Sequence, residues 1–263
     1  MSFITANQIR LYYEVSGEGE PLILIGGLAS DHLGWQVILS ELSRYFRVIT
    51  MDNRGAGQSE VPAEPYTTQM MAEDVADLLQ ALNIPRAHVL GHSLGGAVAQ
   101  QLAIHYPQKI HRLILCHSFV KAAAVTMMAI ETTVKLMTHK VPLTLIAENN
   151  LPWLYSSSFL SDERRRAVAL DRMLNKPHLI TFQGYKNQAA AMLTHDTREY
   201  LCQITAPTLV LTGAEDILVA PEVSKAIAAL LPQATLEIMA NTAHVSQVEQ
   251  PRAFEQIVLH FLK

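Results

Sequence analysis

The fold is decided by residues 88–100, which read HVLGHSLGGAVAQ. The stretch begins as an apolar run, typical of a buried strand, and continues with apolar residues at helical spacing. Between the two parts lies the pattern Gly-x-Ser-x-Gly, from Gly91 to Gly95. A turn this sharp strains the backbone of its central residue, and the flanking glycines remove side chains that would collide there. The stretch therefore predicts a strand, a tight turn that projects the hydroxyl of Ser93, and a helix.

Ser93 is a candidate nucleophile. The helix that starts beside it directs amino-terminal N–H groups at any negative charge that develops on an attacked carbonyl. A serine hydroxyl is a weak nucleophile at neutral pH and needs a base, usually a histidine that a carboxylate holds in the right tautomer. The chain should supply both groups downstream of Ser93.

Two downstream loops offer the acid and the base. Asp216 lies in the loop after the apolar run at residues 208–211, and His244 follows a later apolar run. Serine, acid and histidine is the chain order expected of this architecture. Glu215 competes with Asp216 as the acid, and we favour Asp216.

An early pair of glycines predicts the oxyanion hole. Gly26 and Gly27 follow an apolar run and precede Leu28. Glycine lets the backbone approach a substrate closely, so Gly27 is a candidate substrate contact. The backbone N–H of Leu28 would pair with that of Leu94 to hold a developing oxyanion.

No metal or organic cofactor is predicted. His105, His111 and His117 occupy a helix end and strand flanks without metal-ligand spacing, and we expect them to be structural. Cys116 and Cys202 lie too far apart in sequence for a CxxC site, and two cysteines make no disulfide framework. We expect both to be reduced core residues.

The rest of the chain alternates short apolar runs with helical patterns. Residues 8–15 read as an exposed hairpin strand, with a turn at 17–20 leading into the apolar run 21–25. Strands that alternate with helices predict an α/β fold with a mostly parallel sheet covered on both faces. The other runs expected to form strands are residues 46–51, 87–90, 112–116, 208–211 and 235–239.

The alternation breaks at residues 118–204, where no convincing strand occurs. We therefore predict a helical insertion there, and a core made of residues 1–117 and 205–263. Half of the chain's methionines lie in the insertion. They either form a surface that adapts to a ligand or fill gaps in a small helical subdomain.

Composition excludes several classes of protein. Of the 263 residues, 49% are apolar and 17% charged, as in a globular protein with a substantial core. A formal net charge of −4 gives no field that would attract nucleic acid or anionic lipid. The first residues lack the pattern of a signal peptide, and no purely apolar run of about 18 residues occurs. We expect a cytoplasmic protein without a membrane segment.

The chain resembles the α/β-hydrolase fold superfamily over nearly its whole length. Five segments carry the resemblance, in the family's order: Gly26-Gly27-Leu28 followed by Trp35, Asp52–Ser59, Gly91–Gly96, Gly213–Asp216, and Ala243-His244 with Glu249–Pro251. The resemblance implies an eight-stranded, mostly parallel sheet flanked by helices, with residues 118–204 as a cap over the nucleophile. It implies Ser93 as nucleophile, Asp216 as orienting acid and His244 as general base. Many family members have His-Gly in place of Gly26-Gly27, a difference that leaves the backbone donor in place.

Within the superfamily, the chain is most similar to small bacterial carboxylester and lactone hydrolases, including the 3-oxoadipate enol-lactonase group. Residues 189–196, the strand at 207–210 and the histidine loop carry this similarity. Trp153, on the predicted cap, is either a substrate contact or part of the cap's own core. Epoxide hydrolases and haloalkane dehalogenases of this fold use an aspartate nucleophile, and Ser93 argues against both.

We expect hydrolysis of a small carboxylic ester or lactone through an acyl-enzyme, with water as the second reactant. Hydrolytic C–C cleavage of a vinylogous diketone uses the same three residues and stays open, although the mostly apolar insertion favours an ester. A non-catalytic ligand receptor on a hydrolase fold is a third reading, disfavoured because all three residues are present. The sequence allows a monomer or a homodimer.

Overall fold

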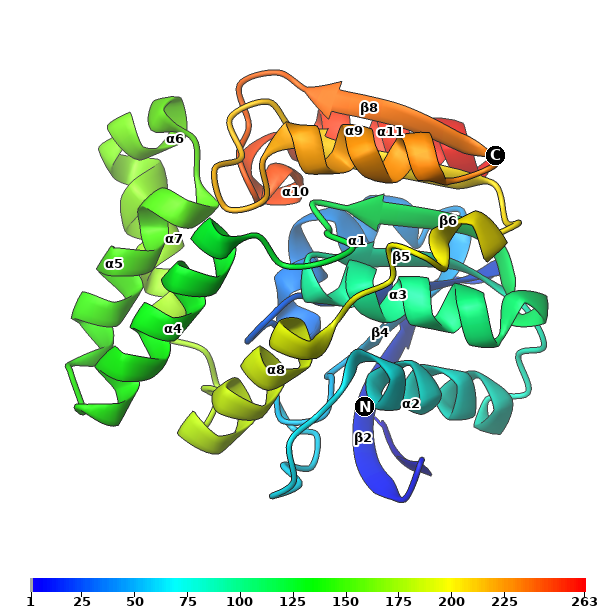
Figure 1. Cartoon of the computed structure of the whole chain (residues 1–263), viewed down its shortest axis with the longest axis horizontal. Helices are drawn as coiled ribbons and strands as arrows, with labels where there is room; N and C mark the ends of the chain where they lie inside the picture. Colours follow the sequence, from blue (N-terminus) through cyan, green and yellow to red (C-terminus); the bar gives the residue numbers. More distant parts are fainter. Residues whose placement is uncertain (1) are drawn as a thin grey trace.

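The computed structural model describes residues 2–263, and one eight-stranded sheet forms its centre (Figure 1). The strands are β1 (Ser2–Ala6), β2 (Ile9–Ser16), β3 (Glu20–Ile25), β4 (Phe46–Met51), β5 (Ala87–His92), β6 (Ile110–Cys116), β7 (Thr208–Gly213) and β8 (Ala234–Met239). They lie in the order β1-β2-β4-β3-β5-β6-β7-β8. Strands β3 to β8 pair in parallel, whereas β2 pairs antiparallel with both β1 and β4. The predicted α/β fold with a mostly parallel sheet is confirmed.

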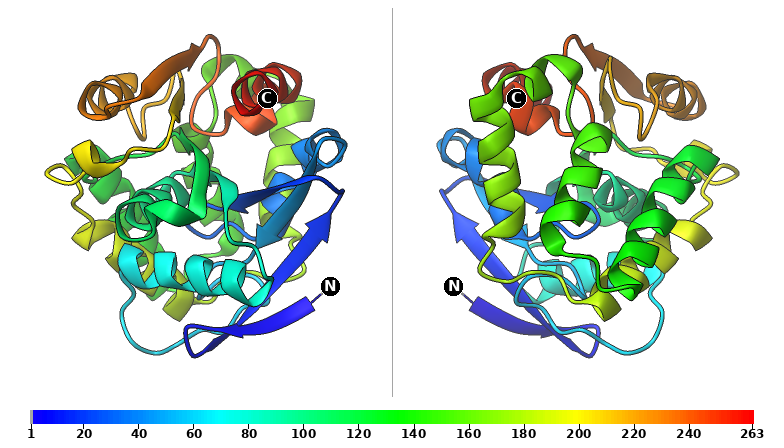
Figure 2. Two further views of the ribbon diagram at one scale, coloured as in Figure 1. Left: turned by 90° about the vertical axis from the view of Figure 1, so that its right-hand side faces the viewer. Right: turned by 90° about the vertical axis from the view of Figure 1, so that its left-hand side faces the viewer.

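The amino-terminal hairpin differs from the prediction. The pattern at residues 8–15 and 21–25 predicts a hairpin, but β2 and β3 are not neighbours, because β4 lies between them. Strand β2 instead forms a hairpin with β1 through a turn at Asn7 and Gln8, whose φ angles are 45° and 65°. Two left-handed residues in succession are typical of tight hairpin turns. This hairpin, drawn in blue, projects at one edge of the sheet (Figure 2).

Helices cover both faces because the central strands are apolar on both sides. On β3, Ile23 and Ile25 share a buried cluster with side chains of α2, α3 and α9, while Leu22 and Leu24 share another with α1 and α11. The helices around the sheet are α1 (Gln36–Leu42), α2 (Thr68–Ala81), α3 (Leu94–His105), α9 (Pro221–Leu230), α10 (Ser246–Glu249) and α11 (Pro251–Leu262), with short 3₁₀ helices η1 (His32–Trp35), η2 (Pro107–Lys109) and η3 (Leu201–Gln203).

The two cysteines lie in different environments. Cys116 is buried in the cluster under α1 and α11, as predicted. Cys202 is exposed, so the prediction that it is a core residue is wrong. It lies in η3, a short connection outside the sheet whose buried residue is Leu201.

Five helices lie between β6 and β7 and are called here the insertion helices. They are α4 (Ala124–Thr138), α5 (Leu143–Leu154), α6 (Ser157–Ser161), α7 (Glu163–Leu174) and α8 (Phe182–Thr194). They stand beside the carboxyl ends of the parallel strands, on the left in Figure 1. A small core of their own contains Leu151, Tyr155, Phe159 and Ala169, against which Val245 packs from the loop after β8.

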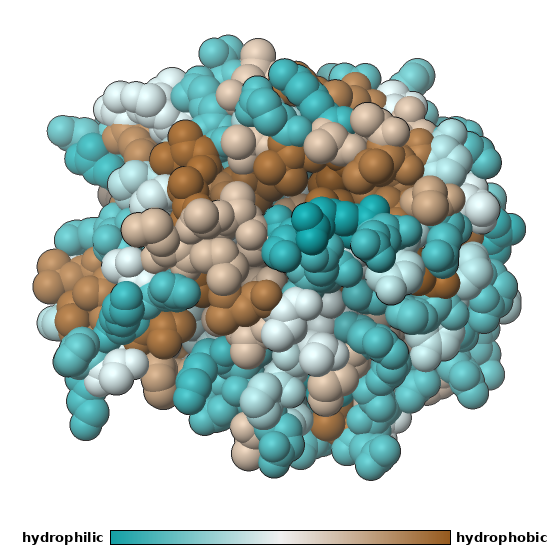
Figure 3. Space-filling view, in the orientation of Figure 1, coloured by the Kyte–Doolittle hydropathy of each residue, from teal (hydrophilic) through white to brown (hydrophobic). Residues whose placement is uncertain are grey.

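The insertion helices also carry apolar side chains on their outer surface. Met128 and Leu145 expose 68% and 53% of their area. Apolar residues, in brown, gather at the left edge of the molecule over these helices (Figure 3). Within residues 2–263, no helix combines the length and apolar character needed to cross a membrane.

Candidate active site

Ser93 lies in the tight turn between β5 and α3. Its backbone has φ 53° and ψ −117°, a conformation that residues with side chains rarely adopt. Only glycines fit two positions before and two positions after Ser93. A Cβ on Gly91 would collide with the backbone of Gly95, and a Cβ on Gly95 with that of Ile25. Ser93 therefore stands at the carboxyl end of a central strand.

Asp216 and His244 form a buried hydrogen-bonded pair. His244 Nδ1 lies 2.8 Å from Asp216 Oδ2, and each residue is only 2% exposed. The other oxygen, Oδ1, accepts from the backbone N–H groups of Leu218 at 3.0 Å and Val219 at 2.8 Å. Glu215, the competing acid, is exposed, and its carboxylate accepts from a backbone N–H of α6 instead. The geometry favours Asp216 as the partner of His244.

A second histidine contacts the same carboxylate oxygen. His117 follows β6 directly, is fully buried, and places its Nδ1 2.9 Å from Asp216 Oδ2. Its Nε2 lies 2.8 Å from the hydroxyl oxygen of Ser246. No local sequence pattern predicts this contact, which arises because β6 and β7 are neighbours and their carboxyl ends meet.

These neighbours determine the charge of each group. Burial alone would raise the pKa of Asp216, but the charge of His244 and the hydrogen bonds from the two histidines lower it well below its ordinary value. Burial lowers the pKa of His117, so that its imidazole is neutral near pH 7. Burial, together with the two neighbouring histidines, also lowers the pKa of His92. Asp216 is thus ionised, whereas His117 and His92 are neutral near pH 7.

His92 ties the strand before Ser93 to the loop of His244. Its Nε2 lies 2.8 Å from the carbonyl oxygen of His244. Because a carbonyl oxygen can only accept, Nε2 carries the proton and donates it. The backbone of His244 is therefore held directly beside the end of β5.

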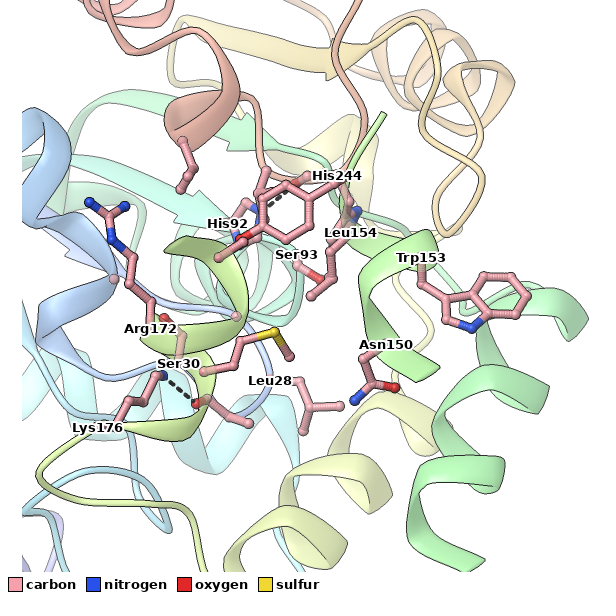
Figure 4. A pocket seen from close by; sticks show the side chains of 18 of the residues that line it. Leu28, Ser30, His92, Ser93, Asn150, Trp153, Leu154, Arg172, Lys176 and His244 are labelled. Carbon is pink, nitrogen blue, oxygen red and sulfur yellow. Dashed lines mark hydrogen bonds between the residues drawn. The ribbon is translucent and has the colours of Figure 1, made fainter. Parts of the chain in front are cut away.

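Ser93 and His244 face one pocket of about 460 Å³ (Figure 4). Among the described residues, the two side chains are not joined by a hydrogen bond, a contact that commonly tightens only when substrate binds. The pocket lies between the carboxyl edge of the sheet and the insertion helices. From those helices, its lining includes Ile130, Asn150, Trp153, Leu154, Met173 and Met192.

The loop after β3 lies against Ser93. A Cβ on Gly27 would come within 3.2 Å of Ser93 Cβ and 3.0 Å of His92 Nδ1, so the backbone is as close as a glycine allows. Leu28 follows in this loop, and Leu94 is the first residue of α3, where a helical N–H has no partner in its own helix. Within residues 2–263, neither of these two N–H groups donates to a protein acceptor. Both are free to bind a negatively charged oxygen.

Side chains of the insertion hold the residue after Leu28. Ala29 has a φ of 61°, and its N–H donates to Gln188 Oε1 at 2.9 Å. Its carbonyl oxygen accepts from Lys176 Nζ at 3.4 Å. Gln188 is fully buried and its own Nε2 donates to the carbonyl of Arg54 at 2.9 Å, which fixes the amide orientation.

Two groups of side chains in the described part of the chain have the spacing of metal ligands. One comprises His117, Asp216 and His244; the other, at the opposite edge of the sheet, comprises Glu20, His88 and His111. Hydrogen bonds account for both arrangements, since the carboxylate of each group lies 3.0 Å or less from an imidazole nitrogen. The expected absence of a metal cofactor stays a prediction.

Comparison with known proteins assigns the family. The sequence profile of the alpha/beta hydrolase fold matches residues 20–251, nearly the whole chain. The chain belongs to the alpha/beta hydrolase fold family. The resemblance stated from five sequence segments is thereby confirmed.

Relatives of this alpha/beta hydrolase support hydrolytic activity. It is 33% identical, over 96% of its own length and 92% of the relative's, to a Yersinia enterocolitica protein named carbamate hydrolase RutD. It is 29% identical to 3-oxoadipate enol-lactonase 2 of Acinetobacter baylyi, over 99% of this chain and 96% of that one. The solved structure of an enol-lactonase from Burkholderia xenovorans has a TM-score of 0.89 at 26% identity and covers 99% of both chains.

In this alpha/beta hydrolase, the residues singled out from the sequence lie around one pocket, with one at its margin. Ser93, His244, Gly27 and Leu28 all line it, and Asp216 lies behind His244. Trp153 also lines the pocket, but its indole ring is turned away from Ser93 (Figure 4).

The contacts that His117, Gln188 and Glu249 make around the site are not predicted from the sequence. His117 follows the strand next to the one that precedes Asp216. Knowledge of the strand order would therefore have placed the two residues together. Gln188 and Glu249 act through contacts between distant segments, for which no local pattern exists.

Proposed function

We propose that this alpha/beta hydrolase cleaves a small carboxylic ester or lactone, with Ser93 as nucleophile, His244 as general base and Asp216 as orienting acid. One observation carries the proposal: a strained turn presents Ser93 in the pocket that His244 also lines, and His244 is bonded to a buried carboxylate. Nucleophile, base and orienting group in this relation are the parts that covalent acyl transfer requires. The backbone N–H groups of Leu28 and Leu94 would form the oxyanion hole.

The hydrogen bonds define the proton transfers. Asp216 accepts from Nδ1 of His244, so in the neutral imidazole Nε2 is the nitrogen that takes the proton of Ser93 as Oγ attacks the carbonyl carbon. The N–H groups of Leu28 and Leu94 bind the oxyanion; losing one such donor typically slows catalysis by about 10²- to 10³-fold. His244 then protonates the leaving alcohol. It next removes a proton from water, whose oxygen attacks the acyl carbon. As the bond from that carbon to Ser93 Oγ breaks and the acid leaves, His244 returns the proton to Oγ.

The insertion would act as a cap. We propose that residues 118–204 form this cap on a core of residues 1–117 and 205–263, with Gly27 and Trp153 as substrate contacts. A pocket of about 460 Å³ is in the range of sites for small molecules. Cytoplasmic location and a monomeric or homodimeric state stay predictions.

A carbamate is the second candidate substrate, because the relative at 33% identity bears the name of a carbamate hydrolase. A carbamate presents Ser93 with the same kind of carbonyl as an ester, and the two substrates differ in the group attached to it. The proposed roles of the three residues are the same for both.

The test compares wild type with Ser93→Ala on p-nitrophenyl esters of increasing acyl length, an enol lactone, a p-nitrophenyl carbamate and a ring-fission dienoate. Ser161→Ala, at an exposed serine of α6, is the matched control. We expect saturable ester or lactone turnover that disappears only in Ser93→Ala. Turnover of the dienoate alone would select C–C cleavage, and the absence of any turnover together with saturable ligand binding would select a receptor.

A further inference from the structure

We propose that His117 is a positioning residue of the triad: it holds Asp216 in place and limits how strongly this carboxylate favours the protonated form of His244. The proposal rests on the proposed function, because it assigns a role relative to His244 as base. It concerns a residue that does not line the pocket and whose ring contacts Asp216 and Ser246 rather than Ser93.

The hydrogen bonds of Asp216 are fully assigned. A carboxylate has about four lone-pair positions. Two are filled at Oδ1 by backbone N–H groups, at 3.0 and 2.8 Å, and two at Oδ2 by the Nδ1 atoms of His117 and His244, at 2.9 and 2.8 Å. Each donor therefore has one defined place, and His117 fills a place that no other described group of the chain occupies.

The tautomer of His117 follows from its partners. Asp216 is an acceptor only, so Nδ1 of His117 must carry a proton. Burial keeps the ring neutral, and Nε2 therefore accepts from the hydroxyl of Ser246, 2.8 Å away. Ser246 lies two residues after His244 at the start of α10. One imidazole thus connects the acid to the segment that carries the base.

Asp216 is the carboxylate that faces His117, and two imidazole rings and a thiol surround the pair. The ring of His244 lies 5.4 Å from that of His117, and the ring of His92 lies 5.7 Å away on the side of β5. Burial raises the pKa of the Cys116 thiol, which precedes His117, so the thiol is neutral. The charge of Oδ2 is thus divided between two N–H donors.

Loss of the His117 donor would have two effects. The charge on Oδ2 would act on His244 alone and favour its protonated form, which cannot accept the proton of Ser93. The carboxylate would also lose one of its four anchors. The first effect moves the acid side of the pH–rate profile to higher pH, and the second lowers kcat with little change in KM.

Two substitutions separate the two ends of the ring. The amide nitrogen of an asparagine falls near the position of Nδ1. His117→Asn therefore keeps the donor to Asp216 and loses the hydrogen bond with Ser246. The amide nitrogen of a glutamine falls near the position of Nε2. His117→Gln therefore keeps a contact with Ser246 and loses the hydrogen bond to Asp216. We expect His117→Asn to retain the acid-side midpoint of kcat/KM. We expect His117→Gln to raise it and to lower kcat by about tenfold, a fraction of what a positioned base contributes.

The result that overturns the proposal is a pH profile of His117→Gln that coincides with that of the wild type, or equal impairment of the two variants. If neither variant folds, ¹⁵N-histidine spectra of the wild type decide: a proton on Nδ1 and a bare Nε2 support the proposal, and any other state of His117 overturns it. Labelling of wild type and Ser93→Ala with a fluorophosphonate reports separately on the proposed function. Equal labelling of both would refute the role of Ser93 without altering the spectra.

Discussion

Ser156 donates two hydrogen bonds to one carboxylate oxygen of Glu249. Its hydroxyl lies 2.5 Å and its backbone nitrogen 3.1 Å from Glu249 Oε2. The other oxygen, Oε1, accepts from the N–H of Ala243 at 2.7 Å, directly before His244. Glu249 is 5% exposed, so these bonds are shielded from water. One buried carboxylate therefore joins the start of α6 to the loop that carries His244.

Glu249→Gln is expected to lower both activity and stability. The amide replaces an acceptor oxygen with an NH₂ group that faces a donor, and a buried donor without a partner costs about 1–3 kcal/mol. Because the affected N–H groups belong to Ser156 and Ala243, kcat should fall more than KM rises. The measurement is ester kinetics with thermal unfolding, and Glu222→Gln on the exposed face of α9 is the control. Unchanged kcat in a folded Glu249→Gln protein would contradict the coupling.

Gln188→Ala is expected to disturb the proposed oxyanion hole from within the insertion. It removes the acceptor for the N–H of Ala29 and the donor to Arg54, so the loop bearing Leu28 loses its fixed position. We expect kcat to fall by about tenfold, less than the loss of an oxyanion donor itself. Gln183→Ala, at an exposed position of the same helix, should have kcat near that of the wild type. Equal kinetics of the two variants would show that Gln188 has no such role.

Gly27→Ala is expected to impair catalysis without unfolding the protein. The new Cβ would lie 3.0 Å from His92 Nδ1 and 3.2 Å from Ser93 Cβ, closer than ordinary contacts, so one of these groups must move. In Gly26→Ala the three atoms nearest to the Cβ belong to Ser30 and not to Ser93 or His92, so the effect on catalysis should be smaller. Fluorophosphonate labelling rates and circular dichroism of both variants give the comparison. A slower labelling rate in Gly26→Ala than in Gly27→Ala would contradict the prediction.

The stability of the protein should fall between neutral and acidic pH because of His195. Burial lowers its pKa from 6.5 to about 4, and its Nδ1 lies 2.8 Å from Thr68 Oγ1. As the pH falls through 6.5, the unfolded chain binds a proton that the folded chain does not, so unfolding becomes more favourable until the folded histidine titrates. The loss approaches about 3 kcal/mol near pH 4.

The check is urea unfolding of the wild type and His195→Asn from pH 7.5 to 4. The wild-type free energy of unfolding should decline more steeply than that of the variant over this range. Parallel curves would contradict the prediction, because they would mean that the pKa of His195 is the same in the folded and the unfolded protein.

Local patterns made much of this molecule predictable. Ser93 follows from glycines at fixed spacing between an apolar strand and a helix, and the order of elements follows from alternating periodicities. The fold class depends on these local signals, and the structure confirms it. The pairing of β2 does not depend on local signals. Whether β2 joins β3 or β4 is decided by contacts across the sheet, and the alternation at residues 8–15 is the same in both arrangements.

The polar groups that support the site were harder to predict. His117 looks like any histidine at a strand end until the order of β6 and β7 places it beside Asp216. Gln188 contacts Ala29 across 159 positions of sequence. Buried polar side chains have no periodicity of their own, so their partners can be read only after the segments are placed in space.

The insertion helices leave and rejoin the core at one place. They start after β6 and end before β7, which are adjacent strands, and the N–H of Thr197 donates to the carbonyl of Val120 at 3.0 Å across the base. Because this hydrogen bond joins the two ends of the insertion, the segment between them could be exchanged for another one, called here a cassette, without altering the register of the sheet. A transplanted cassette would need more than a matching length: it must bring an acceptor for the N–H of Ala29 and a donor for Glu249. New specificity built on this scaffold therefore begins with those two attachments.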